Sequence, residues 1–340
     1  MSAVKEQVLQ YMLKLISAND SKLAAKTLDA FEGAVSKSTV YNYLAELVEK
    51  NIIKKDDSSY KLVTKEYVFE YKNDGTLGED RIFERDIEEK LSELPKNVFS
   101  AWRYAFTEMM NNAIEHSSAD EISVSILKNA LNTTIIIADN GKGIFKNIQQ
   151  YVKGEMNEEL SLKECATLLF AGKFTTAKSM HSGEGIFFTS HLMDSFRIVS
   201  DNVIFSRDNF DDINFEGNIL EEYSTVVFME LNNNSNKTTK EVFNRFSNVE
   251  EGFIKTQIPI AHIFSGTGPV SRSEARRLAE LISKFKQVDL DFINVEEVGQ
   301  AFVHELFIVF QRNNPHVKLN VLNACDDVDF MIRRVINTRE

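Results

Sequence analysis

The sequence predicts a multidomain α/β protein, and three observations support this prediction. Residues 4–48 repeat apolar side chains at helical spacing. The middle of the chain alternates apolar strands with glycine-containing loops, and residues 255–340 alternate short strands with helices. A chain of 340 residues is long enough for roughly two or three domains, each with its own core.

The composition narrows the class of protein. A hydrophobic fraction of 43% and a charged fraction of 26% are typical of globular chains. The net charge of −12 argues against broad coating of nucleic acid, but it permits a small local DNA-reading surface. No apolar stretch approaches the ~20 residues of a membrane helix, and Cys165 and Cys325 lack metal-ligand spacing. We therefore expect a cytoplasmic protein in a reducing compartment, with no membrane contact.

The N-terminal part has the element order of a small helical domain. Residues 4–18 and 22–31 fit two helices, and Ser36 can cap a third helix. Residues 52–63 then fit two short strands around an Asp-Asp-Ser-Ser turn. This order resembles a winged helix-turn-helix, and residues 35–55 are similar to the recognition-helix-to-wing segment of many bacterial transcription regulators.

The resemblance assigns residues 1–65 to this domain and implies contact with double-stranded DNA. In that family the exposed start of the third helix enters the major groove. The corresponding positions here are Lys37, Ser38, Thr39, Tyr41 and Asn42. The basic residues of this segment are few and include no arginine, so docking to another protein is the alternative. Because winged-helix proteins commonly read paired half-sites, a homodimer is a further expectation.

Three motifs follow one another in the middle of the chain. The first is a helix on which polar side chains four residues apart share one face, namely Glu108, Asn112 and His116. The second is the apolar strand 133–139, which ends in an acid and a Gly-x-Gly sequence, and the third is a polar loop that closes on another Gly-x-Gly sequence. The positions concerned are Asp139, Gly141, Gly143, Gly183 and Gly185.

In this order the motifs resemble the N, G1 and G2 boxes of the GHKL ATPases. That superfamily includes histidine kinase catalytic domains, gyrase B, Hsp90, MutL and the anti-sigma-factor serine kinases. The resemblance implies an α/β sandwich, the Bergerat fold, over residues 98–235. Residues 66–97, which begin with a strand-like sequence, would then form a connector and the first helix of this domain.

The resemblance also implies a role for each motif in binding ATP and Mg²⁺. Glu108 would be the catalytic residue that orients or deprotonates the attacking water or hydroxyl. Asn112 would give its side-chain oxygen to Mg²⁺, which bridges the phosphates. Asp139 would accept a hydrogen bond from the adenine amino group. Gly141 and Gly143 would let the backbone turn tightly and approach the base.

The second half of the site is expected in a lid. Residues 144–182 form a long, mostly polar segment that is typical of such a lid. Gly183 and Gly185 would lie where the lid meets a helix whose amides face phosphate. Lys178 follows a sequence similar to the lid of histidine kinases and would reach a phosphate. Thr225, on a strand behind the adenine, would support the acid of the second motif through its hydroxyl.

Two further residues near the lid leave alternatives open. Lys173 is a second cation that could reach phosphate, but a solvent-facing position is the simpler interpretation. Glu184 is an acid between the two glycines, where many relatives carry an apolar or small residue. It would either weaken phosphate binding or point outward.

Residues 255–340 predict βαβ units packed on a sheet. Residues 288–307 resemble the core of STAS domains, and more closely an uncharacterised STAS-like family often found beside GHKL ATPases. In antagonists of this fold a loop carries a phosphorylated serine, but the corresponding residues 296–301 contain no serine or threonine. An interaction with a protein partner is therefore expected from this domain. Ser271 is expected to cap a helix.

Three functions remain open at this point. The first is an ATP-dependent regulator in which slow hydrolysis through Glu108 resets lid closure coupled to the flanking domains. The second is a protein serine/threonine kinase of the anti-sigma type that acts on a partner protein. The third is a non-catalytic, ATP-sensing DNA-binding or scaffold protein. An autophosphorylating histidine kinase is disfavoured because no histidine precedes His116.

Overall fold

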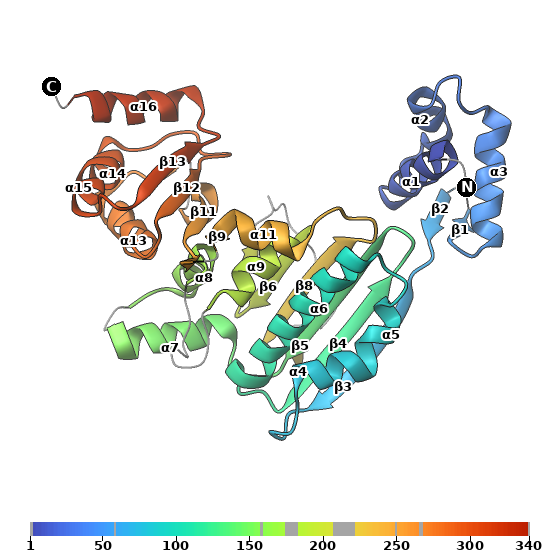
Figure 1. Cartoon of the computed structure of the whole chain (residues 1–340), viewed down its shortest axis with the longest axis horizontal. Helices are drawn as coiled ribbons and strands as arrows, with labels where there is room; N and C mark the ends of the chain where they lie inside the picture. The colour runs from blue at the N-terminus through green and yellow to red at the C-terminus, as the bar shows by residue number, and fades with distance from the viewer. Residues whose placement is uncertain are drawn as a thin grey trace.

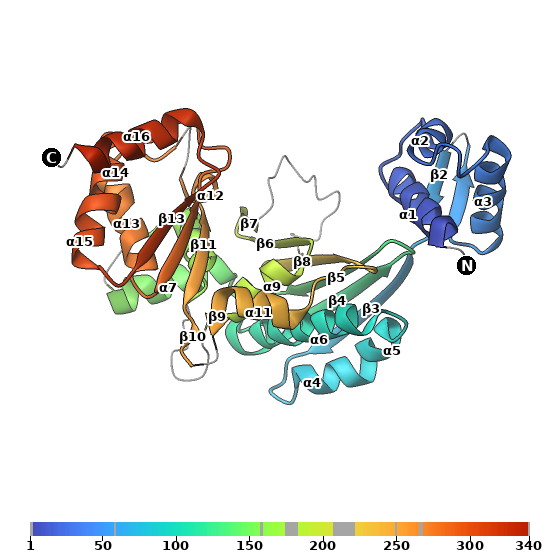
Figure 2. The ribbon, with the colours of Figure 1, turned by 45° about the horizontal axis from the view of Figure 1, so that its top comes forward.

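The computed structural model shows a chain of three successive parts (Figures 1 and 2). A small helical part and a larger α/β part lie on either side of a central sheet covered by helices. The residues that the structure describes are 3–57, 59–156, 159–173, 183–206, 222–248, 250–264 and 268–338, except for the side chains of residues 156 and 170. No helix in these ranges is long and apolar enough to cross a membrane.

The N-terminal part contains the expected helices and hairpin. Its described elements are α1 (Ala3–Ser17), α2 (Leu23–Ala30), α3 (Lys37–Glu49), β1 (Ile53–Asp56) and β2 (Ser59–Leu62). Apolar residues at helical spacing on α1 and α3, such as Val8 and Leu44, are buried in one cluster. The side chain of Ser36 accepts a hydrogen bond from the amide of Thr39 at 3.2 Å, so the predicted cap of α3 is present.

The central sheet contains six strands among the described residues. Their order is β3-β4-β5-β8-β6-β7, and each neighbouring pair is antiparallel. The strands are β3 (Lys65–Lys72), β4 (Glu121–Lys128), β5 (Asn132–Asp139), β6 (Ser195–Ser200), β7 (Val203–Ser206) and β8 (Thr225–Asn232). Strand β3 forms where the expected connector begins with a strand-like sequence, and it pairs with β4 along its whole length. Its alternating Tyr67, Phe69 and Tyr71 pack against the central core, which explains this placement.

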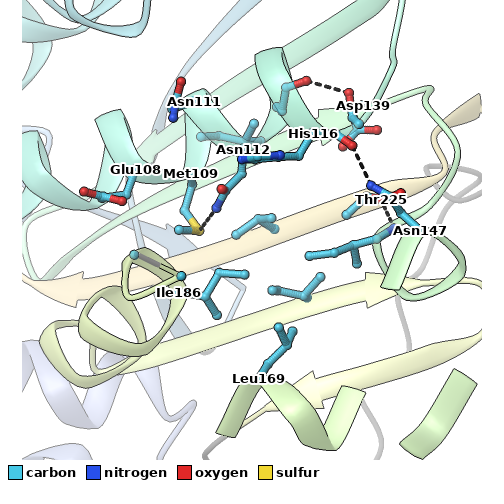
Figure 3. A pocket seen from close by; sticks show the side chains of 18 of the residues that line it. Glu108, Met109, Asn111, Asn112, His116, Asp139, Asn147, Leu169, Ile186 and Thr225 are labelled. Atoms are coloured by element: carbon cyan, nitrogen blue, oxygen red, sulfur yellow. Dashed lines mark hydrogen bonds between the residues drawn. The ribbon is translucent and has the colours of Figure 1, made fainter. Parts of the chain in front are cut away.

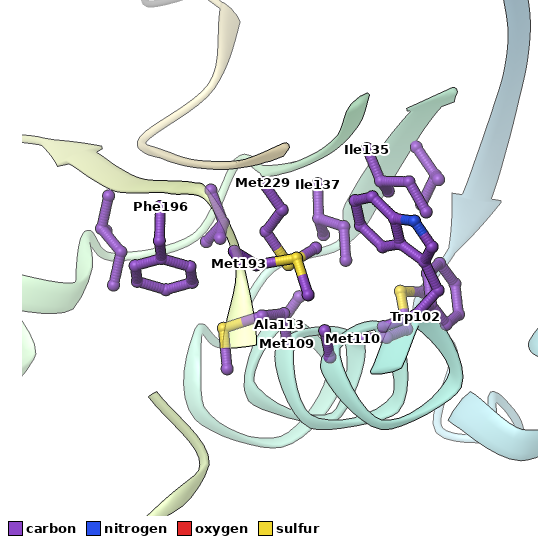
Figure 4. Close-up of a cluster of buried hydrophobic side chains, with 14 of the residues drawn as sticks. Trp102, Met109, Met110, Ala113, Ile135, Ile137, Met193, Phe196 and Met229 are labelled. Carbon is purple, nitrogen blue, oxygen red and sulfur yellow. The ribbon is translucent and has the colours of Figure 1, made fainter. Parts of the chain in front are cut away.

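Helices cover one face of this sheet. They are the continuous run α4 (Glu79–Ile82), η1 (Phe83–Ile87, π-helical) and α5 (Glu88–Leu91), followed by α6 (Lys96–Asn111) and its π-helical extension η2 (Asn112–His116). Figure 4 shows Trp102, Met109 and Met110 of α6 facing Ile135 and Ile137 of β5. Burial of each such large side chain contributes roughly 1.5–3 kcal/mol, so the sheet holds α6 in a fixed rotation.

The predicted lid segment contains two helices, α7 (Ile144–Met156) and α8 (Leu162–Ala171), and α9 (Gly185–Leu192) follows it. Ser161 and Glu164 form a reciprocal capping box at the start of α8. Lys178 lies outside the described residues. The expected lid is therefore largely helical where the structure describes it.

The C-terminal part is built around a parallel sheet in the order β11-β12-β13. A short helix and hairpin precede it, and helices alternate with its strands, as the sequence predicts. The capping box of Ser271 with Glu274 confirms the predicted cap. The elements are α11 (Thr239–Phe246), β9 (Ser247–Asn248), β10 (Gly252–Phe253), β11 (Lys255–Pro259), α12 (Ile260–Ile263), α13 (Arg272–Ile282), β12 (Gln287–Asp291), α14 (Gln300–Val303), η3 (His304–Phe310, π-helical), α15 (Gln311–Asn313), β13 (Lys318–Leu322) and α16 (Asp326–Asn337).

The lid helices are packed against this C-terminal part. Helix α8 contacts β11, α12 and α13. The buried hydroxyl of Thr256 on β11 donates a hydrogen bond to the carbonyl of Ala171 at 3.0 Å. Arg277 on α13 forms an ion pair with Glu164 on α8. The lid therefore lies between the central sheet and the C-terminal sheet.

Two further contacts join the parts. Phe187 on α9 lies in the C-terminal core, with its ring centroid 4.9 Å from that of Phe246 and 4.6 Å from that of Phe253. At the other end of the central sheet, Leu131 in the turn between β4 and β5 is buried in the N-terminal core. Motion of either flanking part is thus linked to an element of the central sheet or its lid.

Candidate functional site

The three central motifs converge on one cavity of about 350 Å³. The cavity lies between the end of α6, the sheet, and the lid helices (Figure 3). Six of the residues predicted for the site line it, namely Glu108, Asn112, Asp139, Gly183, Gly185 and Thr225. Motifs that are far apart in the sequence therefore face a common volume.

Helix α6 positions the first motif because its apolar face is held against the sheet. Glu108 and Asn112 follow on the side that faces the cavity, and the π-helical turn η2 begins at Asn112. Such turns are rare and occur frequently at functional sites. Asn111 also touches the cavity, although Figure 3 shows its side chain on another side of the helix from that of Asn112.

The amide of Asn112 has the arrangement expected of a metal ligand. Its nitrogen lies 4.0 Å from the sulfur of Met109, as a weak donor. Its side-chain oxygen accepts no hydrogen bond from the described residues, although the side chain is only half-exposed. Carbonyl oxygens are ligands that Mg²⁺ accepts. The residue present here therefore fits the ion that the motif implies.

Asp139 is a buried carboxylate that is only partly compensated by the described residues. It is 5% exposed and accepts one hydrogen bond among the described residues, from the Gly141 amide at 3.0 Å. Burial raises its pKa to about 6, and the Gly141 amide opposes this shift only in part. A buried acceptor that faces a cavity is suited to a hydrogen-bond donor on a ligand. The exocyclic amino group of adenine is such a donor.

Gly141 and Gly185 stand where no side chain fits. A Cβ atom on Gly141 would lie 2.2 Å from the backbone carbonyl oxygen of Ser117 and 2.9 Å from Oδ1 of Asp139. A Cβ atom on Gly185 would lie 2.1 Å from Oε2 of Glu108. The second glycine pair thus brings the start of α9 against the carboxylate of the first motif.

The carboxylates of Glu108 and Glu184 share one neighbourhood at the base of the lid. Burial chiefly raises the pKa of Tyr104, and the nearby charges of both glutamates add to this shift. Glu184 lines the cavity and does not simply point into solvent. The two acids bring negative charge to this side of the cavity.

Thr225 has a different local role from the one expected. It lies opposite Asp139 in the β5–β8 pair, but its hydroxyl accepts a hydrogen bond from the Ile144 amide at 3.2 Å and lies 3.4 Å from the Ser200 hydroxyl. The expected hydroxyl support of Asp139 is therefore not among its hydrogen bonds. The chain after β5 turns back over the strand end, so its amides reach both side chains first. Thr225 instead tethers the start of α7.

Sequence reasoning missed residues that brace this turn. Asn147 on α7 donates a hydrogen bond from Nδ2 to the carbonyl of His116 at 2.9 Å, and it lines the cavity. Lys146 forms an ion pair with Asp201, whose carboxylate lies beside Gly143 at the start of the lid. Asn147 is a polar residue in an otherwise amphipathic helix, and no spacing in the sequence links it to the first motif.

Comparison with known families agrees with this geometry. Residues 99–199 match the family described as histidine kinase-, DNA gyrase B-, and HSP90-like ATPase. Residues 274–329 match the STAS-like domain of unknown function DUF4325. No curated protein matched the chain. The chain therefore contains a GHKL ATP-binding domain followed by a STAS-like domain, as its motifs and its C-terminal sequence predict.

Proposed function

We propose that this protein is an ATP-dependent regulator in which nucleotide at the central cavity sets the position of the lid. The lid in turn sets how the STAS-like domain and the N-terminal part are presented. The observation that carries the proposal is the convergence of Glu108, Asn112 and Asp139 on one cavity roofed by helices that contact the STAS-like domain.

Different residues of the cavity bind different parts of ATP. Asp139 accepts the hydrogen bond of the adenine amino group, and Gly141 and Gly143 let the backbone turn tightly beside that carboxylate. Asn112 ligates Mg²⁺, which neutralises charge on the phosphates when it is bound. Gly183 precedes α9 and lines the cavity on the phosphate side.

Hydrolysis in this proposal belongs to Glu108. Its carboxylate lies against Gly185, at the junction of α6 with the end of the lid. From this position it orients a water molecule and accepts its proton as the general base. Lys178, although outside the described residues, is proposed to reach a phosphate when the lid closes. The nearby carboxylate of Glu184 is consistent with slow turnover, because it provides no positive charge that would stabilise the transition state.

Coupling to the STAS-like domain follows from contacts that the lid makes. Ala171 and Glu164 on α8 bind Thr256 and Arg277 of the C-terminal part. A lid that moves with nucleotide must move these partners or break their contacts. The loop 296–301 lacks a serine or threonine, so we propose a protein–protein contact and not a phosphorylation switch for this domain.

The N-terminal part is proposed to be a winged helix-turn-helix that binds double-stranded DNA, with a homodimer reading paired half-sites. Lys37, Ser38, Tyr41 and Asn42 are exposed at the start of α3, and Thr39 is half-exposed. Tyr41 is 50% exposed, which is unusual for a large ring and suits contact with a groove. The β1–β2 hairpin stands in the place of the wing.

The nucleotide proposal is tested by calorimetric titration of ATP with Mg²⁺ into the wild type and Asp139→Asn. The replacement side chain is an amide, whose NH₂ group can stand where the carboxylate accepts a hydrogen bond. We therefore expect at least about tenfold weaker binding of ATP. Asp120→Asn, an exposed change near the same edge of the sheet, is the matched control. Equal affinity in all three proteins would contradict the proposed site.

Phosphate release distinguishes the possible activities. Glu108→Gln should retain ATP binding and lower release by about 10²- to 10⁴-fold, because it removes the general base. Glu115→Gln, an exposed change on the same helix, should leave release unchanged. Transfer of labelled γ-phosphate to a protein would instead indicate a kinase. ATP binding with neither reaction would indicate a non-catalytic sensor.

A further inference from the structure

A second cavity lies at the joint between the lid and the STAS-like domain. It has a volume of about 200 Å³ and lies between α7 and α8 of the lid and α12 and α13 of the C-terminal part. It shares no lining residue with the candidate nucleotide cavity. An apolar cavity of ~150 Å³ is already large enough to bind benzene, so this one can hold a somewhat larger molecule.

The wall of this second cavity is mostly apolar. Its apolar lining includes Leu168 on the lid, Leu278 and Leu281 on α13, and Phe264. Apolar surface from the lid and from the C-terminal part therefore lines one cavity. Filling such a volume with an apolar group recovers dispersion contacts that its lining otherwise lacks.

One edge of the cavity carries positive charge from Lys173 and Lys284. Lys173 is half-buried, and its ammonium lies 4.7 Å from the ring centroid of Phe285 and 5.5 Å from that of Phe253. It donates a weak hydrogen bond to the carbonyl of Lys284 at 3.3 Å and forms no ion pair within the described part of the chain. Burial lowers its pKa, against the opposing attraction of Glu184.

The acids that line this cavity form no ion pair with Lys173, and Glu184, which attracts it, lines the nucleotide cavity instead. Glu164 is occupied by Arg277 and by the Ser161 cap. Glu280 is exposed on the rim. Lys173 and Lys284 therefore remain as adjacent cationic groups at one edge of an apolar cavity. This is the arrangement that binds an anion with an apolar body.

We propose that this cavity, lined by the lid and α13, binds a small monocarboxylate with an apolar body of about the size of octanoate. The apolar body fills the space between Leu168 and Leu281, and the carboxylate pairs with Lys173. Occupancy holds α8 against α13. Its consequence for ATP turnover rests on the proposed function, whereas binding itself does not.

The test is calorimetric titration of octanoate, octanol and octylamine into the full chain. We expect octanoate to bind with a Kd below about 1 mM. Octanol should bind about tenfold more weakly because it lacks the charge-assisted hydrogen bond, and octylamine should bind weakest. No binding of octanoate, or equal binding of octanoate and octanol, would overturn the proposal.

Variants locate the site. Lys173→Gln should reduce octanoate affinity to that of octanol, and Leu281→Trp should block both ligands by filling the cavity. Lys318→Gln, an exposed change on β13 outside the cavity, is the matched control and should bind as the wild type does. Circular dichroism melting checks that each variant folds. Unchanged octanoate binding in both cavity variants would place the ligand elsewhere and overturn the assignment.

The same protein samples separate this inference from the proposed function. ATP with Mg²⁺ is titrated in parallel, and phosphate release is measured with and without octanoate. Octanoate binding without ATP binding would retain this site and contradict the proposed function. ATP binding without octanoate binding would retain the proposed function and contradict the site in the second cavity. A change in phosphate release of at least about twofold with octanoate supports the lid contact, whereas no change with the site occupied contradicts that consequence.

Discussion

The carboxylate of Asp139 lies at the end of β5 with 5% of its surface exposed and one backbone amide as its partner among the described residues. Its pKa is raised from 3.8 to about 6 by burial. The folded protein therefore binds this proton more tightly than the unfolded chain does. The free energy of unfolding contributed by this group falls as pH rises from about 4 to about 6 and stays low above that range.

Because the contribution of Asp139 to the free energy of unfolding falls with rising pH, it leads to a prediction for Asp139→Asn in the absence of nucleotide. The variant removes the buried charge, so it should be more stable than the wild type by up to about 3 kcal/mol at about pH 7. Near pH 4 both side chains are neutral, and the two proteins should be equally stable. Urea unfolding at the two pH values checks this. A variant that is less stable than the wild type at pH 7 would show that the carboxylate is compensated within the protein.

At the scale of elements, the site depends on how closely the turn after β5 passes the end of η2. Hydrogen bonds from the Lys142 amide to Ser117 and from Asn147 to His116 tie these two segments together. The sheet holds β5, and the apolar face of α6 holds the helix. The turn between them therefore has little freedom to move aside.

Gly141→Ala tests this close approach. Its methyl group would overlap the backbone carbonyl of Ser117, which no rotamer change can relieve, so we expect a stability loss of about 1–3 kcal/mol and weaker ATP binding. Gly154→Ala on α7 is the control, because its Cβ would meet nothing within 4 Å. That change should stabilise the helix by up to about 1 kcal/mol. Thermal unfolding and ATP titration measure both effects, and similar behaviour of the two variants would contradict the packing argument.

At the scale of the whole molecule, the lid is shared between two bodies. Thr256→Val removes the hydroxyl that binds the carbonyl of Ala171, and an unpaired buried carbonyl costs about 1–3 kcal/mol. We expect this stability loss in urea unfolding together with altered ATP turnover. Thr27→Val removes another fully buried hydroxyl, in α2, and should leave turnover unchanged. Equal turnover in Thr256→Val and the wild type would contradict coupling through this contact.

One prediction for the N-terminal part does not depend on ATP binding. Lys37→Gln should weaken binding to double-stranded DNA and reduce the slope of log affinity against log salt by about one, because one phosphate contact is lost. Lys26→Gln on α2, whose cation pairs with Asp20, is the control. Fluorescence anisotropy at several salt concentrations measures both. DNA affinity that is absent in the wild type would leave protein docking as the role of this part.

Local patterns in the sequence determined much of this protein. Helical spacing and caps placed α1, α3 and α13, and the three glycine- and acid-containing motifs predicted a nucleotide site and the GHKL class. These features depend on residues close together in the chain, or on a family pattern that preserves their order. The three side chains expected at the site, those of Glu108, Asn112 and Asp139, line one cavity.

Only the tertiary structure decided how distant segments meet. β3, which was expected to be strand-like but to belong to a connector, pairs with β4 along its full length and so joins the central sheet. Thr225 binds the start of α7 and not Asp139, and Asn147 joins the site from the lid. The lid contacts the STAS-like domain through Thr256 and around a second cavity. Such contacts depend on the path of the chain between elements, and residue spacing along one element carries no information about that path.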